Sequence, residues 1–146
     1  MELIDFRESE DHDFDWLIQL HKESYHEVVL SQFGEWDDEF QRKMFVESRK
    51  VQAPKIILFN GEDAGAFSFE HRANYDWIQD IELASQYRNK GIGTAIIENC
   101  ISQARNSTKP LRLQVLHRNV SAQRLYNRLG FVQISELEHH YLYEIL

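Results

Sequence analysis

Two patterns of apolar and polar residues alternate along the chain. Short runs in which apolar and polar positions take turns predict strands, and longer runs whose apolar residues recur every three or four positions predict helices. The expected strands are 3–7, 55–59, 64–69, 77–83, 111–116, 131–135 and 141–145. Helices are expected after Asp11 or Asp13, over 37–48, over 95–103 and after Asn119. This mixture predicts one mixed sheet flanked by helices.

The first two expected helices each carry an apolar face at helical spacing. The face of the first helix comprises Phe14, Leu17, Ile18, His21 and Tyr25. The second helix is expected to bury Phe40, Met44 and Phe45. Between two expected strands, the segment 60–63 reads Asn-Gly-Glu-Asp, which is typical of a hairpin turn.

Composition fits one domain. With 146 residues, 42% of them hydrophobic, the chain can fill a single core, and we expect one domain over 1–146. The one cysteine, Cys100, has no partner for an internal disulfide, so a cytoplasmic protein is expected. The first residues do not read as a basic and apolar leader, and no apolar run approaches 18 residues, which argues against secretion and a membrane span.

The net charge is −8, from 16 basic and 24 acidic residues. Because nucleic-acid binding relies on basic surface, a nucleic-acid partner is not expected. An acidic field would instead attract a cationic amine, although a surplus of acidic residues is also ordinary for a soluble protein.

A glycine-rich segment lies between an expected strand and an expected helix. It comprises Arg88, Asn89, Lys90, Gly91, Ile92, Gly93 and Thr94. The first amides of a helix lack intrahelical partners and attract an anion, glycines allow the backbone to approach it closely, and two basic residues add positive charge. The segment therefore predicts a phosphate site, although a structural turn produces the same Gly-x-Gly pattern.

The spacing within this segment argues against two common phosphate ligands. A P-loop has four residues between its glycines, followed by Lys and then Ser or Thr, whereas one residue separates Gly91 from Gly93. A dinucleotide-binding turn has a third glycine where this chain has Ile96. Nucleoside triphosphates and NAD are therefore not expected.

A second motif follows the strand expected at 111–116. It comprises Asn119, then Ala122, Leu125, Tyr126 and Leu129 at helical spacing, and then Gly130 and Phe131. With Arg88-x-x-Gly91-x-Gly93 before it, this motif makes the chain resemble the GNAT superfamily of N-acetyltransferases, whose members carry both motifs in this order. The resemblance is firm over 77–146, and the order of the earlier elements agrees with it.

The resemblance implies the acyl-CoA N-acyltransferase fold of the α/β (α+β) class, with one mixed, mostly antiparallel sheet. Its central strands, here 77–83 and 111–116, would splay apart and leave a slot for the pantetheine arm of acetyl-CoA. Backbone groups near Leu83 would polarise the thioester, and the amides of 88–94 would bind the pyrophosphate. The implied cofactor-binding residues are Leu83, Arg88, Asn89, Lys90, Gly91, Ile92, Gly93, Thr94, Asn119 and Tyr126.

Acetyl transfer to an amine requires removal of the amine proton, stabilisation of an oxyanion and a proton for the leaving thiolate. The superfamily places a tyrosine beside the sulfur, so the resemblance implies that Tyr126 supplies the last proton. A phenol with a pKa of about 10 suits that role. The alternative is that Tyr126 packs on the core beside Leu125.

Several groups are candidates for the base. Glu82 alternates with its two apolar neighbours on an expected strand and is the first candidate, and Asp80 has the same parity. Some superfamily members use a glutamate on the fifth strand, but the matching residue here is Gln114, which cannot take a proton. His117 and a relay of water molecules are two further candidates for the base.

In this superfamily the wall of the acceptor site comes from the first two helices and their connection, here 25–40. The run 33–39 combines aromatic side chains with four carboxylates, which suits an amine cation through charge pairing and cation–π contact. The expected acceptor-binding residues are Tyr25, Glu35 and Trp36. The alternative is a capped helix start in which Trp36 fills the core.

Neither a metal nor a cysteine nucleophile is expected. His139 and His140 are adjacent on an expected strand and would point to opposite faces. The other histidines, at positions 12, 21, 26, 71 and 117, lack the spacing of metal ligands along the sequence. Cys100 lies among apolar residues of an expected helix, which favours a buried thiol.

The sequence thus predicts an acetyl-CoA-dependent N-acetyltransferase in which an amine attacks the thioester directly in a ternary complex. The alternative is a non-catalytic sensor of acetyl-CoA, or an interaction module, on the same fold. The acceptor would be a small molecule or a peptide with an amine, and the superfamily makes a homodimer possible.

Overall fold

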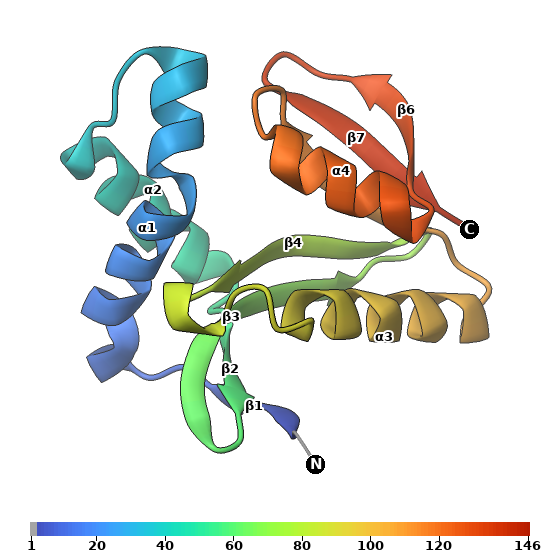
Figure 1. Ribbon diagram of the computed structural model, residues 1–146, viewed down its shortest axis with the longest axis horizontal. Coiled ribbons are helices and arrows are strands. Elements are labelled where there is room, and N and C mark those ends of the chain that lie inside the picture. Colours follow the sequence, from blue (N-terminus) through green and yellow to red (C-terminus); the bar gives the residue numbers. More distant parts are fainter. Residues whose placement is uncertain (1–2) are drawn as a thin grey trace. The chain divides into compact units, whose positions relative to one another are not determined.

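The structure is a computed structural model that describes residues 3–146, within which one sheet of seven strands is accompanied by four α-helices (Figure 1). In chain order the elements are β1 (Ile4–Glu8), η1 (Asp11–Asp13), α1 (Phe14–Phe33), α2 (Asp38–Val51), β2 (Lys55–Phe59), β3 (Glu62–His71), β4 (Asp76–Leu83), η2 (Ser85–Tyr87), α3 (Ile92–Asn106), β5 (Leu111–Leu116), α4 (Val120–Leu129), β6 (Val132–Glu136) and β7 (His140–Ile145). Within the described range, no helix is both long and apolar enough to cross a membrane.

The strand order is β1-β2-β3-β4-β5-β7-β6. Four of the neighbouring pairs, β1 with β2, β2 with β3, β5 with β7 and β6 with β7, are antiparallel. The pairing of β4 with β5 is parallel, with Asp76 opposite Leu111 and Ile78 opposite Leu113. The expected mixed, mostly antiparallel sheet is therefore confirmed, whereas the splaying of its central strands stays a prediction.

The chain divides into two compact units. The first unit comprises Met1–Ser68 and Asp80–Gly93, and the second comprises Phe69–Gln79 and Thr94–Leu146. β3, β4 and α3 each contribute residues to both units. The expectation of one domain over 1–146 stays a prediction.

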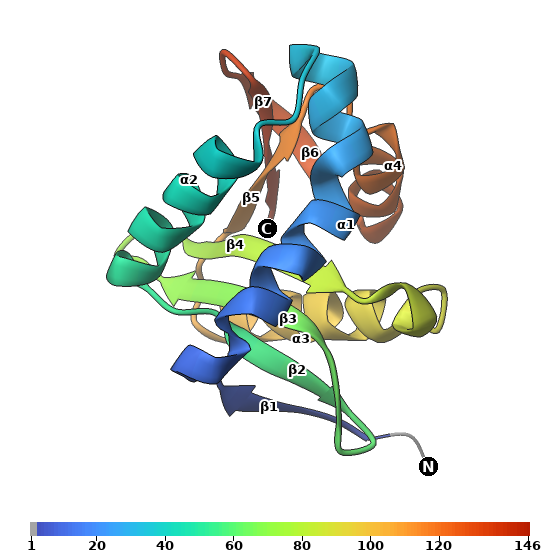
Figure 2. The ribbon, with the colours of Figure 1, turned by 90° about the vertical axis from the view of Figure 1, so that its left-hand side faces the viewer.

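The core of the first unit forms where α1 packs on β2 and β3. Leu17 and Leu20 of α1 cluster with Ile56 of β2 and Ala66 of β3, and Figure 2 shows α1 lying across these strands. The hairpin between β2 and β3 turns at Asn60 and Gly61, whose φ angles of 52° and 84° fit a two-residue turn. The predicted hairpin is confirmed.

The apolar face expected for α2 was wrong for Phe40 and Met44, whereas Phe45 packs against the core as expected. Phe40 and Met44 are 55% and 53% exposed. The helix instead contacts the ring of Phe14, with the Phe45 ring 5.4 Å away and the guanidinium groups of Arg42 and Arg49 stacked on it. At about 100° per residue, positions 42, 45 and 49 share one side of the helix, and positions 40 and 44 lie roughly opposite. Spacing alone could not show which side has a partner.

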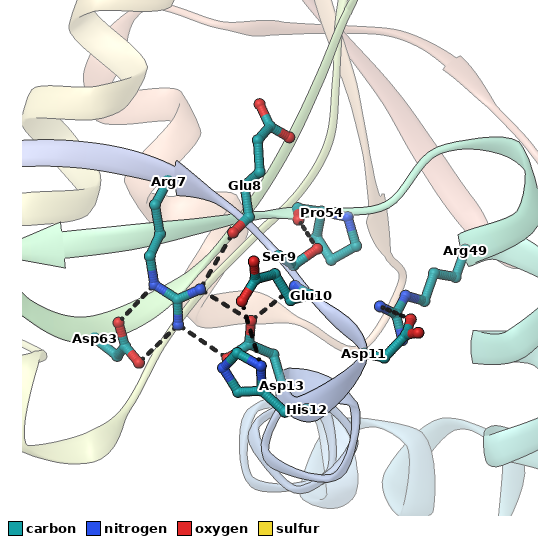
Figure 3. A network of polar contacts seen from close by, with 10 residues as sticks. All are labelled: Arg7, Glu8, Ser9, Glu10, Asp11, His12, Asp13, Arg49, Pro54 and Asp63. Atoms are coloured by element: carbon teal, nitrogen blue, oxygen red, sulfur yellow. Dashed lines mark hydrogen bonds and ion pairs between the residues drawn. The ribbon is translucent and has the colours of Figure 1, made fainter.

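Asp13 lies at the start of α1, as expected, but its carboxylate binds Arg7. Both terminal nitrogens of Arg7 donate to Asp13 at 2.9 Å, and the same guanidinium donates to Asp63 of β3 at 2.8 and 3.0 Å (Figure 3). The amide of Glu10 also donates to Asp13, at 2.8 Å. Arg7 thus links β1, η1 and β3 of the first unit. Hydrogen bonding to Arg7 lowers the pKa of Asp13 to about 2, although burial opposes the shift.

We expect Asp13→Asn to remove a pH-dependent part of the stability. A carboxyl whose pKa is depressed in the folded state stabilises the fold above its unfolded value of about 3.9, and this contribution is lost as the pH falls towards 2. The variant should lose up to about 2 kcal/mol of unfolding free energy at pH 7. Urea unfolding at several pH values measures the difference, which should shrink between pH 4 and pH 2. A constant difference would contradict the role given to this ion pair.

The core of the second unit combines α3, β5, β7 and Phe131, the second residue after α4. Its buried members include Ile97, Leu111, Leu113, Phe131 and Tyr143. Cys100 of α3 is buried with them, and burial, aided by the negative charge of Asp76, raises the pKa of its thiol to about 12. The expectation of a buried thiol is confirmed.

The helices α3 and α4 both begin at residues of the two sequence motifs. α3 begins at Ile92, three residues before the expected start, so Gly93 and Thr94 belong to its first turn. α4 begins after Asn119, whose side chain accepts from the amide of Ala122 at 3.2 Å, and it ends at Gly130 with φ 102°. Asn119 is therefore the N-cap of α4.

Candidate active site

Two carboxyl groups lie on the same side of the end of β4. Asp80 and Glu82 are two positions apart on this strand, so their side chains share a face. Asp80 is half-buried, and the side chain of Glu82 is 4% exposed. Buried carboxyl groups need polar partners, because an unpaired charge is costly away from water.

Those partners come from α1. Nδ1 of His21 is 2.9 Å from Oε1 of Glu82, and the hydroxyl of Tyr25 donates to Oδ1 of Asp80 at 2.8 Å. His21 and Tyr25 are four residues apart and so lie one above the other on the helix. All four residues belong to the first unit. We call these four side chains the acid–imidazole cluster.

The pKa values of the two carboxyl groups of the cluster are both raised, but to different extents. Burial raises the pKa of Asp80 well above its usual range, and the charge of Glu82 and a hydrogen bond to Glu82 act in the same direction. Burial also raises the pKa of Glu82, but a hydrogen bond from Asp80 and the positive charge of Arg88 oppose the rise. The two shifts together favour the proton on Asp80 and the negative charge on Glu82.

Aromatic rings surround His21. The ring centroid of Tyr25 is 5.0 Å from that of His21, and the ring of Trp36 lies 6.0 Å away. Trp36 is half-buried, contacts the ring of His26 at 5.5 Å and donates from Nε1 to Asp38. Of the three expected acceptor-binding residues, the fold thus brings Tyr25 and Trp36 to the cluster, whereas Glu35 is exposed on the segment between α1 and α2.

Ligand atoms of His21, Asp80 and Glu82 lie within 4.8 Å of one another, the spacing of a group that could hold a cation. The sequence did not reveal this group, because its members come from α1 and β4. The hydrogen bonds within the acid–imidazole cluster account for the proximity of the three side chains.

The glycine-rich segment, which belongs to the first unit up to Gly93, turns sharply before α3. Asn89 and Gly91 have φ angles of 60° and 80°, and α3 begins at the buried Ile92. Arg88 and Lys90 are exposed. The first amides of α3 have no partners within the helix, so the arrangement suits a phosphate or pyrophosphate.

Arg88 also reaches back to β4. Its Nε donates to the carbonyl of Leu83 at 2.9 Å, and a terminal nitrogen is 3.5 Å from the hydroxyl of Ser24. The family resemblance implied that the backbone near Leu83 binds the pantetheine and polarises the thioester. The hydrogen bond therefore joins the expected pyrophosphate segment to the expected thioester segment.

Gly65 of β3 is a residue that the sequence analysis missed. A Cβ atom at this position would overlap the carbonyl oxygen of Glu82 and lie 3.0 Å from a methyl group of Leu83. A glycine within a strand often marks such a close approach of another backbone, which is the signal that the sequence offered. Gly65 thus fixes where the end of β4 lies in the first unit.

The remaining predicted residues belong to the second unit. Tyr126 of α4 is half-buried, with its ring centroid 5.8 Å from that of Phe131 and 6.3 Å from that of Tyr143. His117 packs on Tyr141 at 4.5 Å, and within the described residues its buried Nε2 has no hydrogen-bond partner. His117, one of the candidates for the base, is half-buried, and Gln114 is exposed.

Comparison with known proteins identifies the family. The model of the acetyltransferase (GNAT) family matches residues 14–131. The uncharacterized N-acetyltransferase YobR of Bacillus subtilis (strain 168) is 38% identical over 68 residues, which are 46% of this chain and 27% of that protein. The matched part of this chain therefore spans about a quarter of the length of that relative.

Solved structures share the fold. PH1933 from Pyrococcus horikoshii OT3 has a TM-score of 0.74 at 15% identity, over 99% of this chain and 97% of that one. The PaiA N-acetyltransferase from Thermoplasma acidophilum, in complex with coenzyme A, has a TM-score of 0.69 at 16% identity, over 97% and 98%. The ribosomal-protein-S18-alanine N-acetyltransferase from Escherichia coli has a TM-score of 0.67 at 17% identity, over 99% and 93%.

Proposed function

Because the chain belongs to the acetyltransferase (GNAT) family, we propose that it transfers the acetyl group of acetyl-CoA to a primary amine, by direct attack in a ternary complex. The observation that carries this proposal is the acid–imidazole cluster at the end of β4, where ionised Glu82 directly precedes Leu83. The backbone of Leu83 in turn leads into the glycine-rich start of α3 in the same unit.

The donor would bind mainly to backbone groups. The first amides of α3 would hold the pyrophosphate, with the charges of Arg88 and Lys90 nearby, and the backbone at Leu83 would hold the pantetheine. Asn119 would contact the cofactor through groups that its capping of α4 leaves available. The complex of the Thermoplasma acidophilum protein with coenzyme A supports this choice of ligand for the fold.

The transfer requires three proton movements. An alkyl amine is protonated at neutral pH, so the acid–imidazole cluster would first accept its proton, after which the nitrogen attacks the thioester carbonyl carbon. The carbon–sulfur bond then breaks, and Tyr126 would give its proton to the departing thiolate. The attacking nitrogen would lose its second proton to solvent, and the phenol of Tyr126 would regain a proton from solvent. The products are an amide and the free thiol of coenzyme A.

The acceptor would enter as a cation. Trp36 and Tyr25 offer aromatic faces beside the cluster, and Glu35 adds an exposed carboxylate on the same connection between α1 and α2. This combination suits the amine of a small molecule or of a peptide, and the net charge of −8 favours the approach of either as a cation.

Tyr126→Phe tests whether Tyr126 is the general acid that protonates the leaving thiolate. Because only the hydroxyl is removed, we expect kcat to fall about 10- to 100-fold while the affinity for acetyl-CoA is kept. Steady-state kinetics together with calorimetric titration of acetyl-CoA separates the two effects. An unchanged kcat would remove Tyr126 from the mechanism and leave it as a packing residue beside Phe131 and Tyr143.

The proposed function itself is tested by thiol release from acetyl-CoA across a panel of polyamines, amino acids, aminoglycosides and peptides. Release that depends on one class of amine, with the acetylated product found by mass spectrometry, supports the proposal. Binding of acetyl-CoA without turnover on any amine would contradict it and favour a sensor.

A further inference from the structure

We propose that His21 is the catalytic base and that Glu82 positions it, an inference that rests on the proposed acetyl transfer. His21 is a residue of α1 that the family motifs do not mark. It is the member of the acid–imidazole cluster that combines a nitrogen lone pair with exposure to solvent.

The hydrogen bond to Glu82 fixes which nitrogen is the base. A carboxylate can only accept, so Nδ1 of His21 carries the hydrogen that points to Oε1 at 2.9 Å. Nε2 then holds the lone pair, and it lies on the opposite edge of the ring. A histidine whose tautomer is set by a carboxylate is suited to accept a proton at its other nitrogen.

Burial separates the roles of the two residues. The side chain of His21 is 27% exposed, whereas that of Glu82 is 4% exposed. Glu82 also receives hydrogen bonds from His21 and from Asp80, so its carboxylate already has two protein donors. An amine that arrives from solvent therefore meets the imidazole edge before the carboxylate.

The groups around His21 suit an imidazole that gains and loses a proton. The groups that face it are Tyr25 on the same helix, Trp36 from the following segment, and Asp80 and Glu82 from β4. When Nε2 takes the proton, the imidazolium pairs with the single charge of Glu82. Asp80 accepts a hydrogen bond from Tyr25, and in its protonated form it adds no second negative charge beside Glu82.

The step is a proton transfer alone. One proton leaves the ammonium group of the acceptor and binds Nε2 of His21, which leaves the nitrogen lone pair free to attack the thioester. The imidazolium, which is partly exposed, then releases the proton to solvent. The rings of Tyr25 and Trp36 flank the imidazole and limit the directions from which the acceptor can approach.

His21→Asn is the central test, because the amide of asparagine can still donate to Glu82 but has no group in place of Nε2. We expect kcat to fall about 100- to 1,000-fold with acetyl-CoA affinity unchanged. The loss of rate at acid pH that marks a titrating base should disappear, and added imidazole should restore part of the rate of His21→Ala. The matched control is His12→Asn, which changes an exposed histidine of the same unit and should keep wild-type kinetics.

Glu82→Gln separates a positioning residue from a base. Glutamine can accept from Nδ1 but carries no charge, so we expect kcat to fall about tenfold while the acid limb of the pH profile is kept. Nitrogen-15 shifts of His21 in the wild-type protein should show the hydrogen on Nδ1 and a bare Nε2. The shifts require no turnover and so test the geometry by themselves.

Three results would overturn the inference. A His21→Asn variant with nearly wild-type kcat would show that His21 is not the base. Complete loss of activity in Glu82→Gln alone would show that Glu82 is the base. Loss of wild-type activity with a chelator, restored by a divalent cation, would make the cluster a metal site. By contrast, a wild-type protein that acetylates no amine contradicts the proposed function before any variant is made.

Discussion

Gly91→Trp and Gly93→Trp together are expected to weaken acetyl-CoA binding on the order of a hundredfold, the loss of about two charge-assisted hydrogen bonds. Gly91 has φ 80°, which other residues adopt at a cost, and Gly93 lies in the first turn of α3 near a methyl group of Leu83. Two indole rings would cover the amides that the pyrophosphate needs. Calorimetric titration of acetyl-CoA measures the change.

The matched control for this double variant is Gly61→Trp. Gly61 has φ 84° and open space around it, so it carries a similar backbone cost in the β2–β3 hairpin without touching the start of α3. It should bind acetyl-CoA as the wild-type protein does. Undiminished binding in the double variant, with a normal circular dichroism spectrum, would show that the cofactor does not use the helix start.

Gly65→Ala is expected to lower the free energy of unfolding by about 3 kcal/mol, at the upper end of ordinary overpacking. The added methyl group would overlap the backbone carbonyl of Glu82, which cannot rotate away as a side chain can. The end of β4 must therefore shift, and kcat should fall with the stability because Glu82 and Leu83 move. Urea unfolding and steady-state kinetics measure the two effects.

Gly93→Ala is the control for the stability measurement. Its methyl group would meet Leu83 at 3.8 Å, an ordinary contact, and alanine within a helix is favoured over glycine. Its unfolding free energy should equal or exceed that of the wild-type protein. A Gly65→Ala variant that is as stable as Gly93→Ala would contradict the close approach of β3 to β4.

The local patterns of the sequence predicted most elements because each carries its own signal. β5 has the expected bounds, since its apolar and polar residues alternate from Leu111 to Val115. α3 begins earlier than expected because the glycine at position 93 does not prevent the first helical turn. The side of α2 that packs on the rest of the first unit could not be predicted, because it depends on Phe14, a residue of another helix.

The two faces that form the candidate site could each be predicted from the sequence, but the contact between them could not. The alternation along β4 indicated that Asp80 and Glu82 share a face, and helical spacing placed His21 and Tyr25 on one face of α1. Nothing in either pattern says that the two faces meet. The contact between them turned a histidine expected to line the core into the partner of Glu82.

The start of α3 also shows that a sequence pattern does not reveal contacts between different elements. The motif from Arg88 to Gly93 predicted an anion site, and the structure adds that Arg88 donates to the carbonyl of Leu83. A sequence motif gives the residue types of a site, whereas the partner of a long side chain depends on the fold around it. The roles of Asn119 and Tyr126 toward the cofactor stay predictions for this reason.

The measurement that tests the central claim most directly is calorimetric titration of acetyl-CoA into the wild-type protein. We expect one molecule to bind per chain with a dissociation constant of about 1 to 100 μM, the range of ordinary enzyme substrates. Coenzyme A should compete for the same site. Absence of binding at millimolar acetyl-CoA would contradict the assignment of the glycine-rich start of α3, and with it the proposed transfer.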